Sequence, residues 1–311
     1  MKHSLHLLPA HPWRHSRRFA CLALLSWLVT AVGCVPAPVQ QPLSGGDTRA
    51  RLWRIQPPSG FPSHIFATLH SNDPRVTALS GAVRDAFDAS TRLVTELDLG
   101  PAGSRLAVRH ISLEDGRTLS DLVGPRLYNQ CRFILARRGV SESALARMKP
   151  WYVAALITHP PAPGGPALDR LLYQMARARG MEISWLETAA EQAAVYDRLP
   201  LAYQVNMVAR AVGDRHRLAI DRKQLMAYYL AGDLEGMRRF ADRRVGRETG
   251  PMTRSVVAEL VQGRNRRMAG RLGPVLAAGG AFVAVGALHL PGNDGLLALL
   301  ARRGYTVTPV H

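Results

Sequence analysis

The sequence contains few aromatic residues and none of the short motifs that mark common hydrolases and nucleotide-binding proteins. Aromatic residues are 6% of the 311 positions, which argues against a base-stacking surface for nucleic acid. The chain has no nucleophile elbow, no phosphate-binding loop and no metalloprotease helix with paired histidines. Hydrophobic residues at 47% and charged residues at 20% are ordinary globular values, which excludes collagen-like, coiled-coil and wholly disordered chains.

Lysine is almost absent, because only Lys2, Lys149 and Lys223 occur and arginine supplies the rest of the 40 basic residues. Against 23 Asp and Glu residues these give a formal net charge of +17. The arginines are scattered along predicted helices, whereas nucleic-acid binding needs a clustered basic face. We therefore expect no nucleic-acid partner. A basic surface facing anionic lipid or polysaccharide fits the charge equally well.

The apolar run at residues 19–32 is too short to cross a bilayer comfortably, since about 20 residues are needed. It follows a basic N-terminal stretch, with no acidic residue before Asp47. This order is typical of a secretory signal peptide, which we place at residues 1–33. The run ends in Ala31-Val-Gly-Cys34, which resembles a bacterial lipobox with Cys34 as the lipidated residue, although Ala31 stands where leucine is usual. The alternative is ordinary cleavage near Gly33, which leaves a soluble periplasmic protein.

A lipidated Cys34 would anchor the protein to a membrane. Val35, in place of Asp, resembles outer-membrane rather than inner-membrane retention, so we expect the periplasmic face of the outer membrane. Residues 34–49 are rich in Pro, Gln, Gly and Ser and predict a flexible tether. Loss of Cys21 with the signal peptide and use of Cys34 for lipid leave Cys131 without a disulfide partner.

Residues 50–311 form one predicted domain, without an internal repeat or a second linker. Alternating residues at 52–56 and 63–69 predict a β-hairpin. Further strands are predicted at residues 92–98, 181–186, 281–286 and 305–310, the last at a sheet edge because of Pro309. Residues 119–180 and 188–272 are mostly helical, with breaks near Pro200, Gly232 and Pro251. This order predicts an α/β fold with a mixed central sheet and a large α-helical insertion.

Four predicted strands end in an ionisable residue. His70 follows the second strand, Glu96 lies in the third, Glu187 follows the fourth and His289 the fifth. Ligands bind at the carboxyl ends of strands in open α/β sheets, so parallel strands would bring these groups to one edge. Two histidines with one or two carboxylates suit Zn, Mn, Co or Fe. We expect Asp98 on the same strand face as Glu96, which lies two residues before it.

Each of these residues also has a simpler explanation, since polar residues are common where a strand reaches solvent. Thr188-Ala-Ala-Glu191 is a capping box that opens the next helix. Asp169 starts a predicted helix at residues 168–179 and is explained equally well by the helix dipole. His289 lies in a turn rich in Pro and Gly, so we expect its side chain to add little to the core. The positions of these residues along the chain, taken alone, support an exported α/β domain with a candidate metal site.

An ordered set of motifs from about Leu52 to Val310 resembles the TraB/GumN family, which also contains the Tiki proteins. The two segments ending in His70 and His289 match the family's paired G-x-x-H motifs. Ala67 stands where the first motif has Gly, which permits a close backbone approach or a positive φ that Ala resists, and this departure lowers the expected activity. The matching segments are Leu52-Trp-Arg-Ile, Ala67-Thr-Leu-His70 with Asp73-Pro74, Val94-Thr-Glu96-Leu-Asp98, Met148-Lys-Pro-Trp151, Leu186-Glu187-Thr with Glu191-Gln192, Arg264-Asn265, Gly286-Ala-Leu-His289 and Arg303-Gly-Tyr-Thr-Val.

The resemblance implies a fold similar to that of erythromycin-esterase-like and ChaN-like proteins, and a metal-dependent protease activity like that of Tiki proteins. It implies that His70 and His289 bind a divalent metal (Mn, Co or Zn), with Glu187 as a further candidate ligand. Glu96 would be a ligand or the general base. Arg264 or Asn265 would orient the substrate or stabilise the developing oxyanion.

The sequence is consistent with two functions. The first is a metal-dependent hydrolase of the bacterial envelope, acting on a peptide or an envelope polymer. The second is a non-catalytic envelope lipoprotein whose Arg-rich surface binds a polysaccharide or a partner protein. Metal stoichiometry distinguishes the two.

Overall fold

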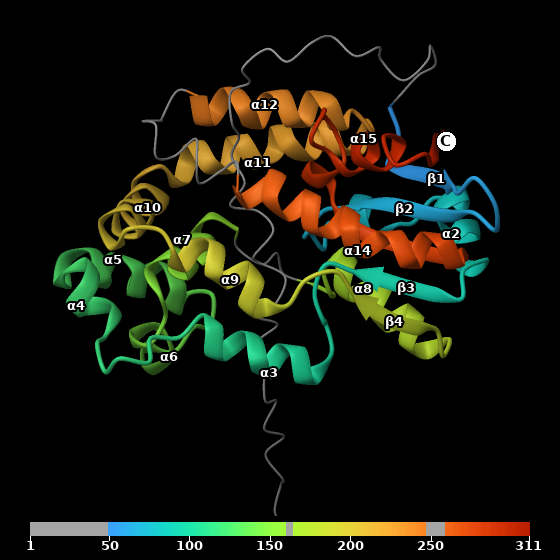
Figure 1. The fold of residues 1–311 in the computed structure, drawn as a ribbon. Coiled ribbons are helices and arrows are strands. Elements are labelled where there is room, and N and C mark those ends of the chain that lie inside the picture. The colour runs from blue at the N-terminus through green and yellow to red at the C-terminus, as the bar shows by residue number, and fades with distance from the viewer. Residues whose placement is uncertain (1–48, 160–163, 247–258) are drawn as a thin grey trace, which may run out of the picture.

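The computed structural model describes residues 49–159, 164–246 and 259–311, so the predicted signal peptide, Cys34, nearly all of the tether and the break at Pro251 lie outside the described residues. A six-stranded mixed sheet has the order β4-β3-β5-β2-β1-β6. Its strands are β1 (Leu52–Gln56), β2 (Ser63–Thr68), β3 (Arg92–Thr95), β4 (Glu182–Trp185), β5 (Ala281–Gly286) and β6 (Thr306–Val310). Helices fill most of the chain between β3 and β5, which confirms the α/β fold with a helical insertion (Figure 1).

The strands that lead to the candidate residues run parallel. β2 pairs with β5, β5 with β3, and β3 with β4, all in parallel register. β1 forms the predicted antiparallel hairpin with β2, and β6 pairs antiparallel with β1 at the sheet edge. The carboxyl ends of β2, β3, β4 and β5 therefore lie along one edge, as a shared binding site requires.

The central strand β5 is covered on both faces. Its first five residues are at most 1% exposed. In Figure 1, α14 (Arg264–Ala278) lies in front of the sheet and α2 (Gly81–Asp88) lies behind it. Phe282 of β5 packs edge-to-face on Phe87 of α2, with ring centroids 5.2 Å apart. A continuous apolar run is what a doubly covered parallel strand needs.

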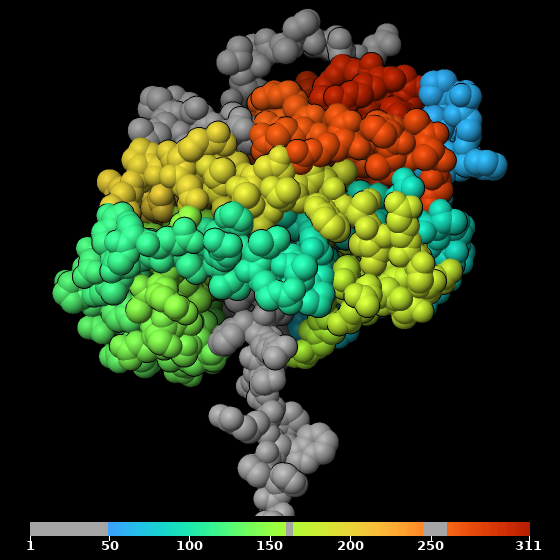
Figure 2. All heavy atoms as spheres, turned by 60° about the horizontal axis from the view of Figure 1, so that its bottom comes forward, coloured from blue at the N-terminus to red at the C-terminus, as the bar shows by residue number. Residues whose placement is uncertain are grey.

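The helical insertion has its own hydrophobic cluster around α7 (Pro150–Thr158), which is buried from Pro150 through Ile157. Figure 2 shows the green helices of the insertion at the lower left, on the opposite side of the molecule from the blue β1 at the upper right. No helix in the described part of the chain is apolar over a length that would span a membrane. The other helices between β3 and β5 are α3 (Pro101–His110), α4 (Leu119–Val123), α5 (Pro125–Ala136), α6 (Glu142–Ala146), α8 (Leu168–Ala178), α9 (Ala189–Asp197), α10 (Leu201–Gly213), α11 (Arg215–Leu230), α12 (Leu234–Gly246) and the π-helical turn η1 (Glu259–Gly263); α1 (Pro74–Thr77), η2 (Ala287–His289) and α15 (Leu296–Ala301) lie outside the insertion.

Several helices begin or end where the local sequence predicts. Thr188 Oγ1 accepts the Glu191 backbone N–H at 3.1 Å, and Glu191 Oε2 accepts the Thr188 backbone N–H at 2.8 Å, which confirms the capping box of α9. Pro200 immediately precedes α10. Gly232, with φ 68°, separates α11 from α12, because glycine adopts this left-handed conformation without a steric cost.

The third strand is shorter than predicted. β3 ends at Thr95, so the expectation that Glu96 and Asp98 share a strand face is wrong. Asp98 Oδ1 accepts the backbone N–H of Gly100 at 2.7 Å, which fixes the turn into α3. A Cβ at Gly103 would lie 2.2 Å from the Asp98 carbonyl oxygen, so the turn also needs glycine at that position. Asp98 therefore shapes the backbone beside the site and points back into its own turn.

Candidate functional site

The structure brings the four strand-end residues together at the carboxyl edge of the sheet. His70 lies two residues beyond β2, Glu96 directly follows β3, Glu187 lies two residues beyond β4, and His289 ends η2, which follows β5. The His289 Nε2 and Glu96 Oε1 atoms are 3.9 Å apart. Arg264 at the start of α14 bridges Glu96 and Glu187.

Glu96 is held as a carboxylate. Its Oε1 accepts the backbone N–H of Gly286 at 2.6 Å, and its Oε2 accepts from Arg264 Nη2 at 2.7 Å. Burial alone would raise the pKa of Glu96, but the charges of His289, Arg264 and His70 and the Gly286 N–H hold it well below its ordinary value. Gly286 opens the second G-x-x-H motif, so that motif contributes a backbone donor as well as His289.

Arg264 and Glu187 form a buried ion pair, with side chains 1% and 0% exposed. Arg264 Nε lies 2.9 Å and Nη2 2.6 Å from Glu187 Oε2, and Gln192 Nε2 donates to the same oxygen at 3.1 Å. Burial opposes the charged form, but the two carboxylates raise the pKa of Arg264 above its ordinary value. Glu187 and Arg264 are thus paired with each other in this structure, and the metal ligation predicted for Glu187 and the substrate contact predicted for Arg264 stay predictions that would have to compete with this pairing.

His289 is locked by Asn265, the second residue of α14. Asn265 Nδ2 donates to the Asp294 carbonyl oxygen at 2.7 Å, which directs its Oδ1 towards His289 Nδ1, 2.6 Å away. Nδ1 must then carry the proton, so the lone pair of the neutral ring lies on Nε2. Burial, followed by the charge of Arg264, lowers the pKa of His289 to about 4. Asn265 therefore fixes an imidazole, whereas the sequence suggested contact with substrate.

His70 is locked by Asp169, the second residue of α8. The two groups meet at 2.6 Å between Nδ1 and Oδ2, and Thr68 donates its hydroxyl to Asp169 Oδ1 at 2.5 Å. Burial lowers the pKa of His70, but the charge and hydrogen bond of Asp169 outweigh it, so the net shift is upward. Asp169 is 6% exposed. Its explanation by the helix dipole alone is wrong, and no sequence signal indicates that α8 begins beside β2.

Ala67 occupies an ordinary strand position. It lies in β2, pairs with Val285 of β5 and is fully buried. An extended strand needs no positive φ, so alanine is unstrained there. The Ala67 carbonyl oxygen accepts the buried hydroxyl of Tyr229 at 3.0 Å, which ties β2 to α11. The loss of the motif glycine therefore leaves the approach to His70 intact.

The site offers two buried nitrogen atoms to a metal rather than a complete coordination sphere. His70 Nε2 and His289 Nε2 are buried without a hydrogen-bond partner, while each Nδ1 is held by an acceptor. This arrangement is typical of histidines that bind metals. Among the described residues, no three or more His, Cys, Asp or Glu side chains form a ready metal-binding group. The charge of the cluster nevertheless favours a divalent cation, because Glu96, Asp169 and Glu187 are three buried carboxyl groups against the one buried guanidinium of Arg264.

Comparison with known proteins places this arrangement in a family. The model of the TraB/PrgY/gumN family matches residues 51–309. Among curated proteins, the chain is 25% identical to "Metalloprotease TIKI2" of Danio rerio, over 92% of this chain and 68% of that protein. No solved structure gives a significant match.

Proposed function

Because the chain belongs to the TraB/PrgY/gumN family, we propose that it is a divalent-metal-dependent hydrolase acting on peptide bonds. The similarity to a protein named a metalloprotease supports the reaction class. One observation carries the proposal. Two imidazole Nε2 atoms without partners are buried beside Glu96, in a cluster with more carboxyl groups than cations.

His70 and His289 would hold the metal through Nε2, with Glu96 as the third ligand or as the general base. A bound divalent ion supplies Lewis acidity towards the scissile carbonyl and lowers the pKa of water. Asp169 and Asn265 orient the two imidazoles. Arg264 keeps Glu96 ionised, which suits a metal ligand; as a general base Glu96 would be weak, because its pKa is held well below neutral pH. Glu187 keeps Arg264 in place.

The same proposal puts the enzyme in the bacterial envelope. Its basis is the predicted signal peptide and the lipobox-like Ala31-Val-Gly-Cys34. We expect an acylated Cys34 at the mature N-terminus, where the lipid would hold the protein at the outer membrane. Mass spectrometry of the native N-terminus checks this, and an unmodified chain beginning at another residue contradicts it.

Metal analysis tests the proposed reaction class directly. Purified full-length protein should contain about one divalent ion per chain, and His70→Ala should lower the occupancy strongly. His216→Ala is the matched control, because His216 is an exposed histidine on α11 outside the site. Exhaustive chelation should abolish cleavage of a quenched peptide library, and added Zn, Mn or Co should restore it.

The absence of both bound metal and peptide cleavage would favour the second function, a binding lipoprotein. If the wild type holds no metal and cleaves no peptide in the library, the protein is better described as a non-catalytic envelope lipoprotein that binds a polysaccharide or partner. Cleavage that survives chelation would instead require a nucleophile other than metal-activated water.

A further inference from the structure

A buried hydroxyl, that of Thr68, lies one contact away from His70. Thr68 is the last residue of β2, two positions before His70, and is 1% exposed. It donates its hydroxyl to Asp169 Oδ1 at 2.5 Å, while the other oxygen of Asp169, Oδ2, lies 2.6 Å from His70 Nδ1. One buried carboxylate is therefore held between two side chains of the same short segment.

A carboxylate that binds a histidine through one oxygen keeps a soft rotation about its Cβ–Cγ bond. The Thr68 hydroxyl restricts this rotation by binding the second oxygen of Asp169. The holder of the other histidine is fixed in the same way, since Asn265 Nδ2 donates to the Asp294 carbonyl oxygen while its Oδ1 meets His289. Each imidazole of the site is therefore held by a side chain that is itself fixed at its second polar atom.

The contact between Thr68 and Asp169 joins elements that are distant in the sequence. The two residues are 101 positions apart, in β2 and in the first turn of α8. The backbone N–H of Leu168 donates to the Ser71 carbonyl oxygen at 3.0 Å, which fixes the start of α8 against the segment after β2. This backbone contact leaves the side chain of Asp169 free to rotate, so the hydroxyl of Thr68 sets its direction.

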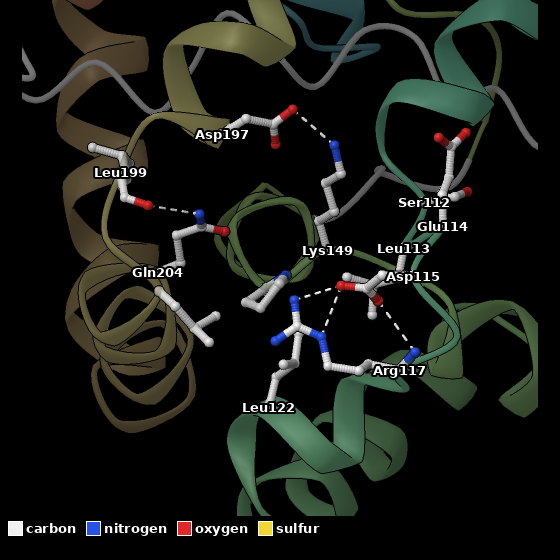
Figure 3. A pocket seen from close by; sticks show the side chains of 12 residues that line it. Ser112, Leu113, Glu114, Asp115, Arg117, Leu122, Lys149, Asp197, Leu199 and Gln204 are labelled. Atoms are coloured by element: carbon white, nitrogen blue, oxygen red, sulfur yellow. Dashed lines mark hydrogen bonds and ion pairs between the residues drawn. The ribbon is translucent and has the colours of Figure 1, made fainter.

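A carboxylate with two donors does not by itself mark a site. Asp197 lines a cavity of about 480 Å³ in the helical insertion and accepts from Lys149 Nζ at 2.7 Å, as Figure 3 shows, and from the Trp151 indole N–H at 2.9 Å. Lysine and tryptophan each carry a single polar side-chain nitrogen, so this pairing orients no second atom. At Asp169 the oriented group is an imidazole whose opposite nitrogen, Nε2, is buried without a partner.

We propose that Thr68 is a positioning residue, whose hydroxyl fixes the Asp169 carboxylate and thereby holds His70 with its Nε2 available to a metal. The inference rests on the proposed function, in which His70 Nε2 binds a divalent ion. The segment Ala67-Thr-Leu-His70 then supplies two functional side chains, because residues two apart on an extended chain point to the same side. Loss of the hydroxyl should weaken metal binding although no ligand is removed.

The test replaces the hydroxyl and measures metal affinity. Thr68→Val removes the hydroxyl and keeps the branched shape, whereas Thr68→Ser keeps a hydroxyl. The probe is Co²⁺, titrated into chelator-treated full-length protein and followed by its visible absorption. We expect Thr68→Val to raise the Kd for Co²⁺ about tenfold, as is usual for the loss of a partner that orients a metal ligand. Thr68→Ser should bind Co²⁺ like the wild type.

Ser63→Ala is the matched control. Ser63 begins the same strand at the opposite edge of the sheet, is also 1% exposed, and accepts the backbone N–H of Ala281 through its hydroxyl at 3.1 Å. Its replacement also leaves a buried polar group unpaired, so it should lower the urea midpoint as Thr68→Val does. The Kd for Co²⁺ should stay unchanged. Thr68→Ala, which places no methyl group at the hydroxyl position, is the second variant and should match Thr68→Val.

The outcomes separate this inference from the proposed function. If the wild type binds Co²⁺ and Thr68→Val and Thr68→Ala bind it equally well, Thr68 has no positioning role and the proposed function stands. Equal weakening in Ser63→Ala or in Thr68→Ser would also overturn the inference, because the loss would then not depend on this hydroxyl. A wild type that binds no Co²⁺ contradicts the proposed function and overturns the inference with it.

Discussion

Arg264→Met is expected to reduce the free energy of unfolding by about 3–5 kcal/mol, the usual effect of breaking a buried ion pair. The substitution would leave Glu96 and Glu187 buried near each other without their shared cation. Like charges in a buried site destabilise the folded state unless one carboxylate takes up a proton. Urea denaturation at neutral pH measures the loss.

Arg271→Met supplies the control on the same helix. Arg271 pairs with Glu191, but these side chains are 44% and 32% exposed, so we expect a loss of at most about 1 kcal/mol. Adding Glu187→Gln to Arg264→Met should recover part of the lost stability, because it removes one unpaired charge. Equal losses for the two arginine variants would show that the buried network has no special energetic role.

His289→Ala is expected to abolish peptide hydrolysis, because it removes one of two imidazoles with a free Nε2. The loss in free energy of unfolding should also be larger than for the replacement of an exposed residue in a turn. His289 is 2% exposed and binds Asn265 Oδ1, so its loss leaves a buried acceptor unpaired, at a cost of about 1–3 kcal/mol. This burial contradicts the expectation that a Gly- and Pro-rich turn leaves the ring outside the core.

Asn265→Ala separates orientation from ligation. It keeps the imidazole but removes the acceptor that fixes Nδ1, so kcat/KM should fall about 10–100-fold. Both variants are measured on the best peptide from the library, with folded content checked by circular dichroism and His216→Ala as the unaffected control. Full activity in His289→Ala would exclude this histidine from the reaction.

The edge of the sheet was predictable because strands and their ends leave local signals. The apolar run before His289 and the short segments before His70 and Glu96 indicate strands, and a shared edge follows only if these strands are parallel, which the structure shows them to be. The capping box at Thr188 was predictable for the same reason, since all of its atoms come from four consecutive residues.

The partners of these residues were not predictable, because they come from helices whose placement depends on tertiary packing. Asp169 and Asn265 each lie in the first turn of a helix, where polar residues are common for local reasons. Only the packing of α8 and α14 against the sheet brings them to His70 and His289. Glu187 and Arg264 are likewise separate candidates in the sequence, and only the structure shows that they form an ion pair.

The position of β5 between β2 and β3 has a consequence for folding. β2 and β3 are made early, but the strand that joins them follows the whole helical insertion. The insertion has its own hydrophobic cluster and can collapse through contacts of low sequence separation. The pairing of β5 with β2 closes a loop of more than 200 residues, so it has high contact order and a large closure entropy. We therefore expect the candidate site to be assembled late in folding, because it needs β5 to dock between β2 and β3.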